Sequence, residues 1–324
     1  MHRRSLAAAL ALAPLAVPAF AQGTASWRPE RPIRFIVGFA AGGSTDITGR
    51  LVAEAISPAL GQPVVVENRI GGAGNIGSEA VARAAPDGHT FVVASVGTHA
   101  TNQFLYPNMG FHVVNDFTPV ALVLTSAAVL VVHPSVRARS VAELVALARE
   151  NPGGLNLGTS GSGGTQHFAG ALFEEKAGVR FTHVPYRGGA PAMADLLAGR
   201  VQVIFSPLAE AMGAIRAGQI IPLGVTRNGR MPALPDVPPI SDTVPGYEFN
   251  SWIGIFGPPR LPQPIVRRMS EVIAEAVRSP ATRQRMEDLG YLPEGGSAED
   301  LARIQQRDFA LMEHLVRVTG AAQQ

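Results

Sequence analysis

Two loops of small residues carry the chemistry that this sequence offers most clearly. The first covers residues 40–46 and the second residues 158–165, and each stands between a predicted strand and a predicted helix. Such a loop directs several free backbone N–H groups, and the positive end of a helix dipole, at one point. Glycines let the backbone approach a ligand closely. Four hydroxyl groups add further donors: Ser44, Ser160, Ser162 and Thr165. The two loops together predict a site for an anion.

Five single side chains could take part in such a site, and each also has a plainer interpretation. His99 follows a strand end and either lines a cleft or bonds to the backbone at a helix start. Arg187 either clamps a carboxylate through paired hydrogen bonds or forms a surface ion pair. Phe39 and Phe205 lie at the ends of apolar strands, where each is either a core residue or part of a cleft wall. Asp46 either pairs with a ligand ammonium or stabilises the first turn of its helix.

Three other kinds of site fit the sequence poorly. Residues 72–77 spell GxGxxG, but they start late after their strand and the next strand ends without an acidic residue, so a tight turn before a packed helix is favoured over a dinucleotide site. A P-loop is excluded because GxxxxGK[ST] is absent and the only lysine, Lys176, lies elsewhere. The eight histidines show no HxH or HExxH spacing, so we predict no metal site and no cofactor.

Strands that alternate with helices must position the two loops. In the first part of the chain we expect strands at residues 32–39, 64–66 and 90–95, with helices at 45–60 and from about 77 to 84. The pattern repeats with helices at 140–149, 165–177, 190–198 and 208–217 and strands at 155–157, 181–184, 201–205 and 220–225. This alternation is typical of βαβ units and predicts two α/β lobes.

The connections between these repeats suggest how the lobes are joined. The long apolar stretch at residues 120–132 is able to cross from one lobe to the other, and the proline-rich residues 227–250 read as a surface connection. A strand at 253–256 and an amphipathic helix around 269–277 follow, and we expect the C-terminal helices to pack on the first lobe. Lobe 1 would then comprise residues 28–124 and 251–324, and lobe 2 residues 125–250.

The N-terminal segment looks like an export signal. Arg3 and Arg4 precede an apolar stretch at residues 6–20, and Ala21 ends a small-x-small cleavage motif, so we predict a signal peptide at residues 1–21. Both the general and the twin-arginine export routes stay open. Residues 22–324 carry equal numbers of basic and acidic side chains, with no basic run for nucleic acid or anionic lipid. The lack of cysteine excludes disulfides and a cysteine nucleophile.

Motifs along the whole mature chain resemble those of the tripartite tricarboxylate transporter receptors, also called the Bug receptor family. They lie, in order, at residues 31–37 (RPIRFIV), 39–46 (FAAGGSTD), 65–69 (VVENR), 74–77 (GNIG), 86–88 (PDG), 116–120 (DFTPV), 158–161 (GTSG), 183–188 (HVPYRG) and 234–238 (LPDVP). Gly38 and Ile70 depart from the family, because proline is common at both positions.

The resemblance implies a periplasmic solute receptor without enzymatic activity. Its fold would be that of the periplasmic binding proteins, the Venus flytrap, in which two lobes with βαβ-type mixed sheets flanked by helices hinge around a cleft. A ligand carboxylate would be held chiefly by backbone groups and ordered waters from residues 39–46, with residues 95–99 and 160–165 completing the site. The receptor would act as a monomer and deliver its ligand to membrane transporter subunits.

The residues expected to bind ligand share a position at a strand end or in one of the small-residue loops. They are Phe39, Ala40, Ala41, Gly43, Ser44, Thr45, Asp46, Ser95, Gly97, Thr98, His99, Ser160, Gly161, Ser162, Gly163, Thr165, His167, Tyr186, Arg187, Phe205 and Ser206. Two other functions stay open. One is a receptor that presents its ligand to a membrane sensor kinase. The other is a secreted serine hydrolase with Ser160 as nucleophile and a base among His99, His167 and His183.

Overall fold

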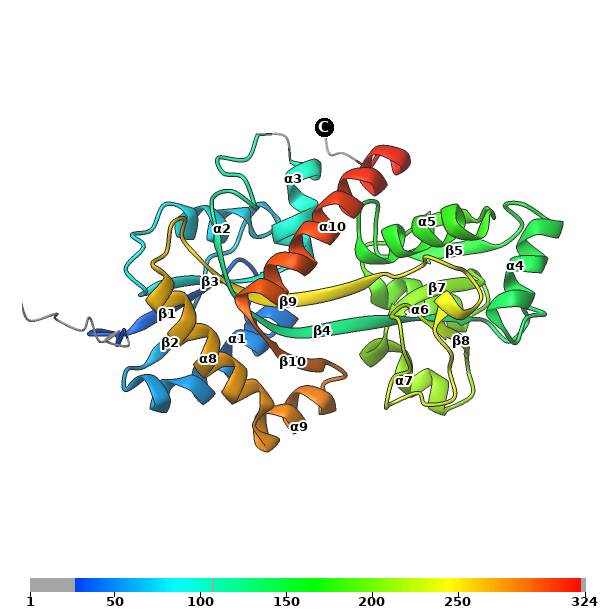
Figure 1. The fold of residues 1–324 in the computed structure, drawn as a ribbon. Helices are drawn as coiled ribbons and strands as arrows, with labels where there is room; N and C mark the ends of the chain where they lie inside the picture. Colours follow the sequence, from blue (N-terminus) through cyan, green and yellow to red (C-terminus); the bar gives the residue numbers. More distant parts are fainter. Residues whose placement is uncertain (1–26, 107, 322–324) are drawn as a thin grey trace, which may run out of the picture.

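The computed structural model describes residues 27–106 and 108–321, which form two α/β lobes side by side (Figure 1). Two long strands, β4 and β9, run from one lobe toward the other. The predicted two-lobed α/β architecture is therefore confirmed. The predicted signal peptide lies outside the described residues.

The elements follow one another in the alternating order that the sequence predicts. The strands are β1 (Ile33–Val37), β2 (Val64–Asn68), β3 (Thr90–Ser95), β4 (Thr118–Val132), β5 (Asn156–Thr159), β6 (Thr182–Pro185), β7 (Val203–Pro207), β8 (Ile221–Val225), β9 (Asn250–Gly257) and β10 (Leu292–Gly296). The α-helices are α1 (Ser44–Leu60), α2 (Asn75–Ala82), α3 (Asn102–Leu105), α4 (Val141–Glu150), α5 (Thr165–Ala177), α6 (Gly189–Leu197), α7 (Leu208–Arg216), α8 (Gln263–Arg278), α9 (Pro280–Asp288) and α10 (Ala298–Thr319).

Each lobe has its own mixed sheet, and β4 belongs to both. In lobe 1, β1 lies between β2 and β3 in parallel, and β9 joins β3 to the first half of β4 in antiparallel pairs. In lobe 2, β5 runs parallel to β6 and β7, while β7 and β8 pair antiparallel with the second half of β4. The carboxyl ends of β1 and β3, and those of β5 and β6, therefore carry the loops that the sequence singled out.

The C-terminal helices pack on lobe 1, as expected. Helix α8 buries the apolar face that its periodicity predicts, including Met269, Val272 and Ile273. Helix α10 crosses β4, and Trp252 on β9 donates a hydrogen bond of 2.9 Å from Nε1 to the buried Asp308 of α10. The end of α10 reaches lobe 2, where His314 Nε2 contacts Glu175 of α5. Helix α10 thus ties lobe 1 to lobe 2.

Three features differ from the sequence-based expectation. The crossing segment is one strand, β4, that starts two residues earlier than predicted. A further strand, β10, pairs with β4 although its sequence LPEGG reads as a turn. The proline-rich segment before β9 is more than a surface connection, because Met231, Ile240 and Tyr247 within it are buried against lobe 2. No helix of the described residues is long and apolar enough to cross a membrane.

Candidate functional site

The loop after β1 leaves the first turn of α1 open to a ligand. Gly43 precedes the helix in an extended conformation, with φ −75° and ψ 166°, and no side chain caps the helix. The first backbone N–H groups of a helix have no partner within their own helix, and Gly43 has no side-chain oxygen to accept from them. The start of α1 therefore combines free N–H donors with the positive end of the helix dipole. Ser44 adds an exposed hydroxyl at the same place.

Asp46 holds the loop after β1 in place through hydrogen bonds. Its buried carboxylate accepts hydrogen bonds from Gly42 N at 2.9 Å, from Arg50 Nε at 3.0 Å and from Asn68 Nδ2 at 2.8 Å. The hydrogen bond with Arg50 is the main reason why the pKa of Asp46 falls to about 2. Because both carboxylate oxygens are occupied, Asp46 acts in the loop's structure, and the ligand-ammonium role does not fit.

The loop after β5 gives lobe 2 a matching helix start. Gly164 precedes α5 in an extended conformation, again without a side-chain cap. The N–H of Gly163, whose φ is +78°, donates to His167 Nδ1 at 3.0 Å. The ring of His167 lies edge-on to His183, with 5.1 Å between the ring centroids. His167 therefore supports the glycine loop through this hydrogen bond. Burial of the His167 imidazole lowers its pKa.

A cavity of about 220 Å³ lies between the lobes, lined by residues 163–165 of the second loop and by Phe39, which directly precedes the first. Four of the predicted ligand-binding residues line it: Phe39, Gly97, Gly163 and Thr165. A Cβ placed on Gly163 would lie 3.5 Å from the Leu105 side chain of lobe 1, so the two lobes are in close contact here. That residues 40–46 face the second loop across the lobes stays a prediction.

Sequence reasoning missed several residues of the cavity wall. Asn102, Phe249 and Met312 line it, although in the sequence they lie outside both small-residue loops. Asn102 Nδ2 donates to Ala73 O at 3.0 Å and to Asn75 Oδ1 at 2.7 Å, which fixes the start of α2 against the cavity. Only the tertiary fold brings these positions together.

His99 lies in the core of lobe 1 and not in the cleft. Its side chain is fully buried, and its ring centroid lies 4.4 Å from that of Phe117 and 4.6 Å from that of Phe256. Burial lowers the pKa of His99 to about 3, so the imidazole is neutral. The neighbouring Thr98 is also buried, and its hydroxyl bonds to Ser95 N and Ser95 O. Contact between His99 and a ligand does not fit this position.

Four further candidates have local structural partners or lie outside the cavity wall. Phe205 is a core residue, packed against Phe173 and Tyr247. The fully buried Ser206 donates to Pro207 O at 3.3 Å, and the Tyr186 hydroxyl donates to Asp195 Oδ2 at 2.8 Å. The remaining one, Arg187, is exposed and does not line the cavity. For the other loop residues, ligand binding stays a prediction. They are Ala40, Ala41, Ser44, Thr45, Ser95, Ser160, Gly161 and Ser162.

The geometry gives a serine hydrolase no support. Within residues 27–106 and 108–321, Ser160 forms no hydrogen bond with a histidine, and His167 Nδ1 is occupied by Gly163. Among the three candidate bases, His183 pairs with an acid, Glu174, at 2.8 Å between Nε2 and Oε2, and this pair joins β6 to α5. Over the same described residues, no group of three or more acidic or histidine side chains is placed to hold a metal ion.

Residues 48–320 match the family described as "Tripartite tricarboxylate transporter family receptor". The chain belongs to this receptor family. The UPF0065 protein in the tcbD-tcbE intergenic region of Pseudomonas sp. (strain P51) is 38% identical over 316 residues, which cover 97% of this chain and 94% of that protein. The family assignment makes the chain a solute-binding protein of the periplasmic type.

Solved structures support the same family and fold. Rpa4515 of R. palustris, solved with adipate, is 37% identical, with a TM-score of 0.74 over 91% of this chain and 99% of that chain. MatC (Rpa3494) from Rhodopseudomonas palustris, solved with bound malate, is 32% identical, with a TM-score of 0.69 over 89% of this chain and 99% of that chain. Adipate and malate are both dicarboxylic acids.

Proposed function

We propose that this receptor captures a small organic carboxylate between its lobes and delivers it to a membrane transporter of the tripartite tricarboxylate type. The observation that carries the proposal is the pair of uncapped helix starts, α1 after Gly43 and α5 after Gly164, one in each lobe. Phe39, which directly precedes the first loop, and Thr165 from the second line the same cavity. The adipate and malate bound to two family members support a carboxylate as the ligand class.

The energetics of such a site are sufficient without a buried cation. A hydrogen bond to a charged group contributes about 1.5–3 kcal/mol, and a micromolar dissociation constant needs about 8 kcal/mol. A few backbone N–H groups, acting together with two helix dipoles, supply that amount after the cost of ordering the ligand. A ligand that contacts both loops would also favour the closed arrangement of the lobes.

Three further parts of the proposal concern the whole chain. We infer that lobe 1 comprises residues 28–124 and 251–324 and that lobe 2 comprises residues 125–250, because β4 changes from the first sheet to the second near residue 127. We infer export to the periplasm with cleavage near Ala21, on the strength of the N-terminal sequence. The receptor is proposed to work as a monomer.

The substitution Gly43→Asp tests carboxylate capture by α1. The backbone at Gly43 has the extended conformation of an N-cap, so an aspartate there would accept from the free N–H groups and stabilise the helix. It would also occupy and repel the site of the ligand carboxylate. We expect unchanged or slightly raised thermal stability, together with a fall in carboxylate affinity of about tenfold or more, measured by calorimetric titration.

The matched control is Pro262→Asp, which adds the same charge at the exposed, uncapped start of α8. We expect this variant to bind as the wild-type protein does. Wild-type affinity in Gly43→Asp, with the protein folded, would show that the start of α1 does not hold the carboxylate.

A further inference from the structure

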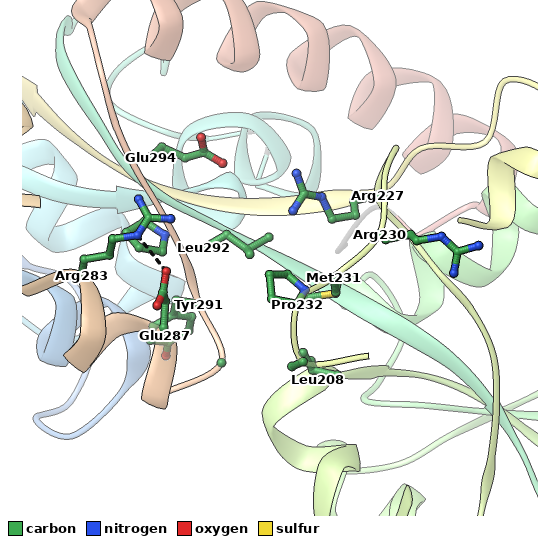
Figure 2. Close-up of a pocket in the computed structure, with 13 residues that line it drawn as sticks. Leu208, Arg227, Arg230, Met231, Pro232, Arg283, Glu287, Tyr291, Leu292 and Glu294 are labelled. Carbon is green, nitrogen blue, oxygen red and sulfur yellow. Dashed lines mark ion pairs between the residues drawn. The ribbon is translucent and has the colours of Figure 1, made fainter. Parts of the chain in front are cut away.

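A second cavity, of about 400 Å³, lies between the lobes on the side of α9 and β10 (Figure 2). Leu208, Arg227, Met231 and Pro232 form its wall on lobe 2, while Tyr291 and Leu292 form the wall on lobe 1. The lining therefore combines an apolar surface with charged groups at its edge. None of the residues predicted from the sequence to bind the ligand lines this cavity.

Three arginines line this cavity, and Arg227 is the one whose guanidinium faces the space without a partner among the described residues. Arg283 is paired with Glu287, with 2.9 Å between Nε and Oε1, and the Glu294 carboxylate accepts a hydrogen bond of 2.6 Å from Thr125 Oγ1. Arg230 donates to Pro235 O at 2.6 Å, and its guanidinium points away from the cavity (Figure 2). Arg227 is half-buried, directed into the space between the lobes, and has no ion-pair partner within the described part of the chain.

The cavity adjoins the loop that is proposed to hold the ligand carboxylate. Tyr291, which lies in its wall, has its side chain beside that of Ser44, the first residue of α1. On the opposite side, Leu208 is the first residue of α7. A ligand anchored at the start of α1 therefore has an apolar surface beside it, with a guanidinium on the far lobe. A guanidinium that lacks an acid, and is set in partly apolar surroundings, binds a carboxylate through two parallel hydrogen bonds.

We propose that Arg227 binds the second carboxylate of a dicarboxylic acid whose first carboxylate lies at the start of α1. This inference rests on the proposed function and narrows the ligand to an acid with two carboxylates and an apolar spacer. The spacer packs on Leu292, Met231 and Pro232. Because Arg227 belongs to lobe 2 and α1 to lobe 1, such a ligand also bridges the two lobes.

Calorimetric titration of the mature protein with straight-chain diacids from succinate to suberate, each beside its half-amide, tests this inference. The half-amide keeps one carboxylate and the same spacer length, so it isolates the contribution of the second charge. We expect the best diacid to bind about 10- to 100-fold more tightly than its half-amide. In Arg227→Gln this ratio falls to about one, while the half-amide binds as it does to the wild-type protein.

Two controls keep the outcome specific to Arg227. Arg230→Gln removes the neighbouring arginine that points away from the cavity and should leave the diacid preference unchanged. Glu294→Gln tests whether Arg227 instead pairs with Glu294 when the lobes close. If Glu294→Gln weakens diacid and half-amide together, and Arg227→Gln does the same, the arginine acts as a latch between lobes and the inference is overturned.

The same titrations separate this inference from the proposed function. Equal binding of diacid and half-amide to the wild-type protein, or a diacid preference that survives Arg227→Gln, overturns the role of Arg227 and leaves carboxylate capture intact. If neither the diacids nor the half-amides bind, the role of Arg227 is overturned, and the wider panel of carboxylates decides whether carboxylate capture stands. A thermal melt of each variant confirms that it is folded.

Discussion

Two buried ionisable side chains near the cleft, Asp46 and His99, each keep a single protonation state, and the physical reasons are opposite. Asp46 stays charged because Arg50, Asn68 and the Gly42 N–H all bond to it, which lowers its pKa to about 2. His99 stays neutral because burial among aromatic rings removes its solvation and lowers its pKa to about 3. Asp46 thus supports the ligand loop from behind, and His99 supports the core. At the residue scale, neither group is free to exchange a proton with a ligand.

The substitution His99→Leu should make the protein less sensitive to acid. As the pH falls below about 6.5, unfolded His99 binds a proton that the native ring does not bind until about pH 3, so the native state loses stability. Leucine removes this loss. We expect the unfolding free energy of the variant, relative to wild type, to rise by about 2 kcal/mol between pH 7.5 and pH 5.

Urea unfolding at the two pH values measures this change, and a carboxylate titration of the same variant should give the wild-type affinity. A stability difference independent of pH would mean that His99 is accessible to protons in the native state. Loss of carboxylate binding in a folded variant would place His99 at the ligand after all.

At the scale of elements, the GxGxxG sequence at residues 72–77 packs the start of α2 against the end of β1. A Cβ on Gly38 would lie 2.5 Å from the Gly74 Cα, and a Cβ on Gly77 would lie 3.0 Å from the Gly38 Cα. Gly74 also has a φ of +95°, which side chains rarely adopt. The glycines thus permit close backbone contact under the ligand loop, which matches the packed-turn interpretation. Gly38, which departs from the family's proline, takes part in this contact.

The substitution Gly38→Ala should therefore destabilise the protein by about 1–3 kcal/mol, because the added methyl group meets backbone that cannot move aside cheaply. The matched control is Gly213→Ala within α7, where a Cβ meets open space. There alanine should stabilise by about 0.4–1 kcal/mol, since it only restricts the unfolded chain. Chemical unfolding of both variants gives the comparison, and equal effects would contradict the packing argument.

Local sequence signals predicted some elements well and others poorly. Helix α5 has the predicted bounds, because Gly164 and Gly178 flank it and both adopt cap conformations. Strand β10 was missed because its pairing with β4 is decided by tertiary contact, while its proline and two glycines read as a turn.

The candidate site shows the same division. Both glycine loops were evident from composition, since small residues between strand and helix have a local signature. The orientation of His99 was not evident, because the turn at Gly97–Thr101 that directs its ring into the core follows from the packing of Phe117 and Phe256. Arg227 carries no local signal, since its importance comes from facing a cavity formed with the other lobe.

At the scale of the whole molecule, the site depends on two lobes that share strands and one long helix. β4 belongs to both sheets, β9 runs beside it, and α10 lies on lobe 1 while its end contacts α5. These connections hold the two lobes beside each other (Figure 1), with the cavity between them. A ligand that bonds to both loops stabilises the native protein by mass action, because the unfolded chain has no such site.

Thermal unfolding of the mature protein with a panel of carboxylates, each beside its matched amide, tests the central claim most directly. A ligand at about 100 times its dissociation constant stabilises the native state by about 2.7 kcal/mol, which raises the midpoint by several degrees. We predict such a rise with at least one acid and none with its amide. Equal shifts with acid and amide, or no shift with any acid in the panel, would contradict capture of a carboxylate by the two helix starts.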